Sequence, residues 1–304
     1  MVLFWYYRQM TSETGYIIAV DGGGTSCRVA VADMDGTILG RSLQGAANVV
    51  SNVEGAVSNI AAGARAALAE AGLSHVDLPT LPAFMGLAGV AVAGDLDEIG
   101  AQLPFARSVF EDDAAIAMQG ALGDDDGIVA ILGTGSVYVG RQGEIMRRAG
   151  GWGFVVGDLG SGARLGRALL QDTLLAHDKI FTHSPLTRAV MAEFGDDPIE
   201  LVDFAQQETP GGFARFAPMV FEYAEQGDPI GSALVKGAVA HVDAALAAVT
   251  WPQCKVLCLM GGLAPLYRDR IEPRFRAMLR EPKADALTGA VQLAVRQFGG
   301  ETRT

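Results

Sequence analysis

The stretch "IAVDGGGTSCRVAV", residues 18–31, joins two apolar runs through a turn of three glycines and a threonine. Two such runs on either side of a glycine turn predict a pair of antiparallel strands. A hairpin turn needs fewer glycines than this, because glycine is required only where φ is positive. Two interpretations stay open here: a simple turn, or a loop whose unhindered backbone N–H groups bind phosphate.

A second stretch repeats this pattern. Residues 127–151, "GIVAILGTGSVYVGRQGEIMRRAGG", again read as strand, Gly/Thr turn, strand, tight turn and strand. We interpret this as an internal repeat of architecture, which predicts two similar domains. Strands alternate with helical segments elsewhere, so the predicted fold class is α/β. The expected elements are strands at 16–20, 27–33 and 37–43, a helix at 53–72, a short helix at 94–102, a mostly helical region at 162–250, a buried strand in "CKVLCLMGG" at 254–262, and helices at 266–280 and 285–299.

Polar and glycine clusters follow several of the predicted strands, where ligands bind in α/β folds. Asp21 ends the first strand and is a candidate for holding Mg²⁺ through water. The acids Glu111–Asp113 in "FEDDAAIA" either cap the following helix or supply a general base for phosphoryl transfer. The turn Gly133–Ser136 matches Gly22–Thr25 in the repeat, so both are candidate phosphate loops that would grip a polyphosphate from two sides.

Two further stretches leave a structural and a functional interpretation open. "GGWGFVVGDLGSG", residues 150–162, is either a structural loop or a sugar contact, because an aspartate beside an aromatic ring suits sugar hydroxyls. Paired glycines after a strand, Gly261 and Gly262, either lead into a helix or let an adenine or ribose approach the backbone.

Composition narrows the class of protein. The chain has 304 residues, enough for one large or two medium domains, and 50% of them are hydrophobic. The formal net charge of −12 argues against nucleic acid or an anionic membrane surface as a partner. Backbone N–H groups would then have to supply the local positive potential for an anionic nucleotide.

Three cysteines form no disulfide framework and favour a reducing, cytoplasmic setting. Cys254 and Cys258 would lie on one face of the strand in "CKVLCLMGG", about 13 Å apart, which is too far for one metal ion. We expect residues 1–14 to be a disordered extension rather than a signal peptide. No apolar stretch is expected to span a membrane.

These stretches, in this order, resemble the sugar-kinase/actin-like ATPase superfamily. More narrowly, they are similar to the N-acetylglucosamine kinase and bacterial glucosamine kinase family, with its BadF-type ATPase relatives. The resemblance implies ATP and Mg²⁺ as cofactors and Asp113, in "DDAA", as the catalytic base. It implies phosphate and nucleotide contacts from Gly22, Gly23, Gly24, Thr25, Gly133, Thr134, Gly135, Ser136, Gly261 and Gly262. It implies sugar contacts from Asn48, Gly89, Asp113, Gly151, Trp152, Gly153 and Asp158.

The resemblance also implies the architecture. Two ribonuclease-H-like domains would enclose a central nucleotide and sugar cleft. Residues 15–123 with 284–304 would form the domain on the sugar and phosphate side, and residues 124–283 the domain on the nucleotide side. A homodimer is expected, as is common among such kinases.

Two departures from the family pattern leave the sugar undecided between N-acetylglucosamine, glucosamine and another hexosamine. Ala88 stands where a hydroxyl is common, and Leu159 stands where a glutamate is frequent.

Two other functions stay open. One is an ATPase that activates a dehydratase through an iron–sulfur cluster, and the other is a non-catalytic nucleotide-binding regulator.

Overall fold

The computed structural model describes residues 15–50, 52–90 and 93–299, so the predicted extension at residues 1–14 lies outside the described residues. The chain divides into two compact units. Unit 1 comprises the chain up to Ile116 and from Ala286 onwards, and unit 2 is Ala117–Asp285. The chain therefore crosses twice between the units, first inside helix α3 (Asp113–Leu122) and then just before helix α12 (Ala286–Phe298).

Unit 1 contains a five-stranded sheet in the order β3-β2-β1-β4-β5. Its first three strands form an antiparallel meander, while β4 and β5 run parallel to β1. The strands are β1 Tyr16–Gly22, β2 Cys27–Asp33, β3 Ile38–Gln44, β4 Pro82–Leu87 and β5 Arg107–Asp112. β1 is apolar up to Asp21 because it is central and buried on both faces.

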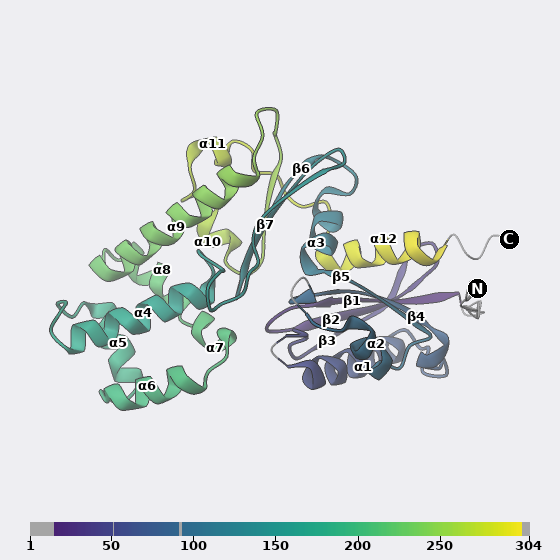
Figure 1. Ribbon diagram of the computed structural model, residues 1–304, viewed down its shortest axis with the longest axis horizontal. Coiled ribbons are helices and arrows are strands. Elements are labelled where there is room, and N and C mark those ends of the chain that lie inside the picture. The colour runs from purple at the N-terminus through teal and green to yellow at the C-terminus, as the bar shows by residue number, and fades with distance from the viewer. Residues whose placement is uncertain (1–14, 51, 91–92, 300–304) are drawn as a thin grey trace, which may run out of the picture. The chain divides into compact units, whose positions relative to one another are not determined.

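Helices cover both faces of this sheet. Figure 1 shows α12 along one face and helices α1 (Val53–Glu70) and α2 (Leu96–Gln102) along the other. Apolar side chains of α1 recur at helical spacing and are buried with alternate residues of β1 and β2. The 3₁₀ turn Leu78–Thr80 leads into β4.

Unit 2 contains a four-stranded sheet in the order β8-β7-β6-β9, with β6 parallel to β9 and antiparallel to β7. The strands are β6 Gly127–Leu132, β7 Ser136–Gln142, β8 Ile145–Gly150 and β9 Leu257–Met260. The helices are α4 Gly162–His177, α5 Pro185–Glu193, α6 Pro198–Gln207, α7 Pro210–Ala214, α8 Ala217–Glu225, α9 Pro229–Val249, α10 Ala264–Arg268 and α11 Pro273–Arg276.

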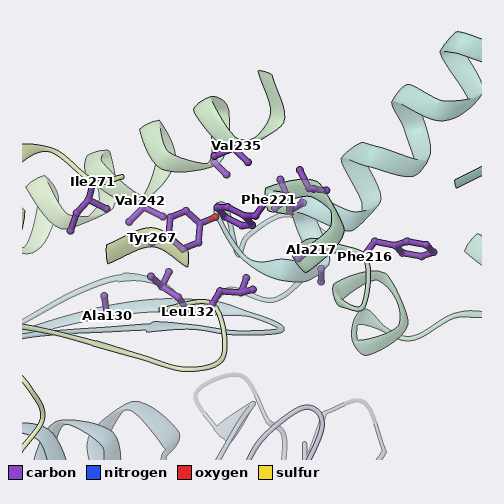
Figure 2. Packing of buried hydrophobic residues seen from close by; sticks show 14 of the residues in the cluster. Ala130, Leu132, Phe216, Ala217, Phe221, Val235, Val242, Tyr267 and Ile271 are labelled. Atoms are coloured by element: carbon purple, nitrogen blue, oxygen red, sulfur yellow. The ribbon is translucent and has the colours of Figure 1, made fainter. Parts of the chain in front are cut away.

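The core of unit 2 joins the sheet to this helical layer. Figure 2 shows Tyr267 of α10 between Leu132 of β6 and Val242 of α9, all of them buried. The hydroxyl of Tyr267 donates a hydrogen bond of 2.6 Å to the carbonyl of Gly160. This bond pairs the buried polar group and ties α10 to the glycine-rich stretch before α4.

Helix α9 is long enough and apolar enough to cross a membrane, with a mean hydropathy of 1.4 over 18 residues. A single helix of this kind is weak evidence for a span, because the core helix of a globular domain has the same composition. One stripe of α9 is buried in the core of unit 2, with Val235, Val242 and Leu246 at its centre. We therefore interpret α9 as a core helix.

Two local predictions were wrong. The helix expected at 266–280 is two short helices, because Pro273 takes the first position of α11 and the N–H of Glu272 donates to the Asp243 carboxylate at 2.9 Å. Cys254 is not on a strand: its N–H closes a turn onto the carbonyl of Trp251, and β9 begins only at Leu257.

A buried carboxylate joins two helix N-termini in unit 2. Asp228 caps α9 by accepting from the N–H groups of Ile230 and Gly231, and its second oxygen accepts from the N–H of Leu186 in α5. Burial alone would raise the pKa of Asp228, but the N–H groups of Gly231 and Leu186 outweigh it and hold the pKa below its usual value.

Asp228→Ala is expected to lower the free energy of unfolding by about 2–3 kcal/mol, because a helix cap is lost and a buried N–H is left without an acceptor. Asp197→Ala, which removes the exposed cap of α6, should cost only about 1 kcal/mol. The stability from the Asp228 charge is present above pH ~4 and is lost as the pH falls through the lower pKa of the folded state. Urea unfolding of the wild type and both variants at pH 7 and pH 3 measures these free energies of unfolding. An equal loss of stability in Asp228→Ala and Asp197→Ala would contradict the role of Asp228 as a cap shared by two helices.

Candidate active site

The glycine turn of unit 1 lies between β1 and β2. The N–H of Gly23 donates to the carbonyl of Ser26 at 2.8 Å, which closes the turn. A Cβ on Gly22 would lie 2.5 Å from Leu87 Cδ2, so packing itself requires glycine there. A Cβ on Gly23 would meet only the Ser26 carbonyl, at 3.6 Å. Packing therefore explains the glycine at position 22 and not the one at position 23.

Backbone hydrogen bonds gather two other predicted segments beside this turn. The carbonyl of Gly22 accepts from the N–H of Ala88 at 2.7 Å, and the carbonyl of Gly23 accepts from the N–H of Ala47 at 3.0 Å. Asn48 follows Ala47, and a Cβ on Gly89 would lie 3.1 Å from Asn48 Oδ1. The structure thus brings the glycine turn and two of the expected sugar contacts of unit 1, Asn48 and Gly89, to one edge of the sheet.

The acidic cluster reaches the same edge. Gly22 pairs with Leu87, and Leu87 pairs with Asp112 across the parallel strands. The carboxylate of Asp112 accepts from the N–H of Ala114 at 2.9 Å, so Asp112 caps helix α3. Asp113, the first residue of α3, is half-buried. The capping function and the candidate base thus belong to different residues.

Asp21 is buried directly before the turn and forms an ion pair with Arg28, its partner across the β1/β2 ladder. Arg28 was not among the predicted site residues. A hairpin that pairs Gly22 with Cys27 necessarily pairs Asp21 with Arg28. The strand register expected for this hairpin would therefore have identified Arg28 as the partner of Asp21. Burial, with a smaller effect from Asp21, raises the pKa of Cys27 to about 12, which keeps it a neutral thiol.

The described residues hold no group of three or more His, Cys, Asp or Glu side chains that would bind a metal ion by themselves. Mg²⁺ in phosphoryl-transfer sites usually binds through one or two carboxylates, several waters and the phosphates of the substrate. A single carboxylate at the start of the predicted phosphate turn, that of Asp21, fits this mode.

The second glycine turn, in unit 2, is held from one side by the start of α4. The N–H groups of Gly162 and Ala163 donate to the carbonyls of Gly133 and Thr134, at 2.8 and 3.2 Å. The hydroxyl of Ser136 donates to the carbonyl of Leu159 at 3.0 Å. The first N–H groups of α4 and the Ser136 hydroxyl are therefore used within the protein.

Trp152 and Asp158, both in the 150–162 stretch, have opposite environments. Trp152 is 66% exposed, whereas Asp158 is buried against Gly135, where a Cβ would lie 3.0 Å from Asp158 Oδ2. Burial raises the pKa of Asp158, while hydrogen bonds from the N–H groups of Gly153 and Ser136 oppose this shift. The structure thus joins Asp158 to the predicted second phosphate loop.

The paired glycines after β9 differ in their surroundings. Gly261 has φ of +90°, and a Cβ there would lie 2.4 Å from the carbonyl of Leu132. The same carbonyl accepts from the N–H of Leu263 at 2.9 Å. Gly262 is exposed, and a Cβ there would meet no atom within 4 Å. Packing requires Gly261, while Gly262 is open to a ligand.

The predicted residues thus form two groups. One group, on unit 1, contains Asp21, the Gly22–Thr25 turn, Asn48, Gly89 and Asp113. The other, on unit 2, contains the Gly133–Ser136 turn, Gly151–Gly153, Asp158 and Gly261–Gly262. Each group lies where parallel strands of its sheet end, as in other ligand-binding α/β folds.

The model of the BadF/BadG/BcrA/BcrD ATPase family matches residues 18–294. The chain belongs to this family. Among curated proteins, glucosamine kinase GspK of Vibrio cholerae is 33% identical to this chain over 280 residues. The match covers 92% of this chain and 95% of GspK. The N-acetyl-D-glucosamine kinase of Dictyostelium discoideum is 28% identical and covers 72% of this chain and 74% of its own length.

A solved structure is similar over most of the chain. It is a Chromobacterium violaceum protein assigned provisionally as an N-acetylglucosamine kinase, 35% identical, with a TM-score of 0.85 over 92% of this chain and 98% of its own. The predicted α/β fold class and the resemblance to this kinase family are confirmed.

Gly23→Val is expected to abolish ATP binding while leaving the unfolding midpoint near that of the wild type, because a side chain fits the protein there but blocks approach to the backbone. Gly22→Ala is the matched control, in which the clash with Leu87 should lower stability. Calorimetric titration with ATP and thermal unfolding measure the two effects. Normal ATP binding by Gly23→Val would contradict the phosphate-loop assignment.

Proposed function

We propose that the protein is an ATP-dependent kinase that phosphorylates an amino sugar at its 6-hydroxyl group. The observation that carries this proposal is the gathering of Gly22–Gly23, Asn48 and the β5–α3 junction at one edge of the unit 1 sheet by backbone hydrogen bonds. Phosphoryl transfer needs such a combination: hydrogen-bond donors that bind the phosphates, a site for the hydroxyl that accepts the phosphoryl group, and a carboxylate. The curated relatives named above are kinases of glucosamine and N-acetylglucosamine.

In the proposed reaction, Asp113 accepts the proton of the 6-hydroxyl as that oxygen attacks the γ-phosphorus of ATP. The bond from the γ-phosphorus to the bridging oxygen breaks, and ADP leaves. The phosphates lie against the turns Gly22–Thr25 and Gly133–Ser136, where the backbone N–H groups that are not used within the turns bind them, and Gly261 and Gly262 lie on the adenosine side. The sugar is contacted by Asn48, Gly89, Asp113, Gly151, Trp152, Gly153 and Asp158.

Mg²⁺ would be held by Asp21 through water together with the ATP phosphates, and it would neutralise phosphate charge. Arg28 already pairs with Asp21 and keeps that carboxylate in place at the turn. Asp21 therefore serves as an outer ligand and not as the core of a preformed metal site.

The identity of the sugar rests on two positions. Both backbone polar groups of Ala88 are used, by Gly22 and Val49, so its methyl group is what replaces the expected hydroxyl. Leu159 keeps its carbonyl bonded to Ser136, and its side chain is 44% exposed. These losses remove polar contacts without disturbing the loops, so we propose that recognition of the 2-substituent is altered.

We further propose that the protein is a cytoplasmic homodimer. We also propose that it binds neither nucleic acid nor membrane, because its net charge of −12 opposes binding to either polyanionic surface. Residues 15–123 with 284–304 would form the sugar side and residues 124–283 the nucleotide side. An iron–sulfur activator is not favoured, because Cys27 and Cys258 are buried and burial raises the pKa of each of the three thiols.

Asp113→Asn is expected to lower sugar-dependent ADP release by at least about 10²-fold, because the amide cannot accept the hydroxyl proton. Asp112→Asn is the matched control on the neighbouring residue. An asparagine oxygen still caps α3, so most of the activity should remain. A coupled ADP assay measures both, and full activity of Asp113→Asn would remove Asp113 from the catalytic role.

A sugar panel tests the substrate class. ADP release should depend on an amino sugar, with glucosamine and N-acetylglucosamine compared against glucose and N-acetylmannosamine. Tight ATP binding with no turnover on any sugar would instead support a non-catalytic nucleotide-binding protein.

A further inference from the structure

A row of paired residues crosses the unit 1 sheet near the end of β1. Residues paired across neighbouring strands direct their side chains to the same face of a sheet. The row runs through Leu43, Arg28, Asp21, Gly86 and Glu111. Neighbouring strands lie about 4.8 Å apart, so Arg28 and Gly86 are about 10 Å apart, on either side of Asp21. Arg28 and the end of β4 therefore flank the Asp21 carboxylate on one face.

Helix α3 packs on that same face. A Cβ on Gly86 would lie 2.4 Å from Ile116 Cδ1, so the helix touches the sheet there. Asp113 precedes Ile116 by three residues, and residues three apart lie on one face of a helix. The candidate base and Arg28 therefore lie over the same face of the sheet, on opposite sides of Asp21.

The guanidinium of Arg28 has unused hydrogen-bond donors. Its ion pair joins Nη2 to Oδ2 of Asp21, and the side chain is 46% exposed. A guanidinium has five N–H donors in a planar fork. Within the part of the chain that the structure describes, the guanidinium has no partner other than Asp21. Asp21 thus anchors one corner of the group and leaves its other N–H groups open to a ligand.

The predicted site residues of unit 1 include no positive charge. Asp21 and Asp113 are acidic, and the others are glycines, Thr25 and Asn48. A triphosphate that approaches two carboxylates is repelled unless cations offset them, and Mg²⁺ supplies only part of that charge. Arginine suits the remainder, because its fork matches two phosphate oxygens and stays protonated. An arginine on the transferred phosphoryl group also stabilises the charge of the transition state.

We propose that Arg28 binds the terminal phosphate of ATP, the one that is transferred, through the N–H groups that Asp21 does not use. The terminal phosphate is the one that must also lie beside Asp113, and both side chains lie over the same face of the sheet. This inference rests on the proposed kinase function. It gives the ion pair a second effect, since the carboxylate of Asp21 then positions Arg28 for the phosphate.

A comparison of two nucleotides tests this contact. Calorimetry on the full chain, without sugar, measures the Kd of a non-hydrolysable ATP analogue and that of ADP. Arg28→Gln should raise the first about tenfold or more and the second less than about threefold, because ADP has no terminal phosphate to lose. Arg28→Lys keeps the charge without the fork and should fall between Arg28→Gln and the wild type. Equal rises for both nucleotides would overturn the proposal.

Arg65→Gln is the matched control. Arg65 is exposed on α1, which covers the opposite face of the sheet and packs against Val20 and Val29 (Figure 1). Both Kd values of this variant should match those of the wild type. Partial misfolding of Arg28→Gln would not imitate the expected result, because unfolded protein affects the two titrations alike.

A double variant separates phosphate binding from simple neutralisation of Asp21. The titrations are repeated without Mg²⁺, so that loss of a metal ligand does not intervene. If Arg28 only neutralised Asp21, Asp21→Asn/Arg28→Gln would bind the ATP analogue as tightly as Asp21→Asn. We expect the double variant to bind about tenfold more weakly than Asp21→Asn. Equal Kd values for these two variants would overturn the proposal.

Steady-state kinetics separate this inference from the proposed function. Arg28→Gln should lower kcat by at least about 10²-fold, with little change in the KM for the amino sugar. A wild type with sugar-dependent ADP release and an equally active Arg28→Gln would overturn the inference and leave the kinase function intact. A wild type without such release on any sugar would overturn the proposed function, and this inference with it.

Discussion

A single hydrogen bond between two strand ends organises the candidate site of unit 1. The N–H of Ala88 reaches the carbonyl of Gly22 at 2.7 Å, and Leu87 and Ala47 pack so closely on Gly22 that no side chain has room there. This close approach sets the end of β4 against the glycine turn. The neighbouring bond from Ala47 to Gly23 then adds the loop that carries Asn48. Backbone groups therefore position the residues of this edge that are predicted to contact ligands.

Unit 2 uses the same device with different residues. The N–H of Leu263, which lies between β9 and α10, donates to the carbonyl of Leu132 at the end of β6, and a Cβ on Gly261 would clash with that same carbonyl. The internal repeat seen in the sequence is thus more than a similar order of strands. It repeats a physical solution, in which a glycine lets a strand end approach its parallel neighbour and leaves a polar turn at the edge.

The sequence predicted most of this arrangement, because strands, turns and helix caps are local features. The strand–turn–strand units and the long first helix follow from apolar periodicity and glycine placement. Which glycine is needed for packing did not follow, since Gly22 and Gly23 look alike until Leu87 is in place. The division of tasks between Asp112 and Asp113 likewise depends on where α3 begins. Pro273 indicated the break between α10 and α11. The prediction instead followed the helical spacing of the residues around the proline.

Helix α12 carries a consequence for how the chain is made. It covers one face of the unit 1 sheet, yet it is separated from the rest of that unit by the whole of unit 2. As the polypeptide leaves the ribosome, the strands of the first unit therefore emerge with one apolar face bare, and this face stays so while about 170 further residues are translated. The unit begun first is completed last, and unit 2 is free to fold in between.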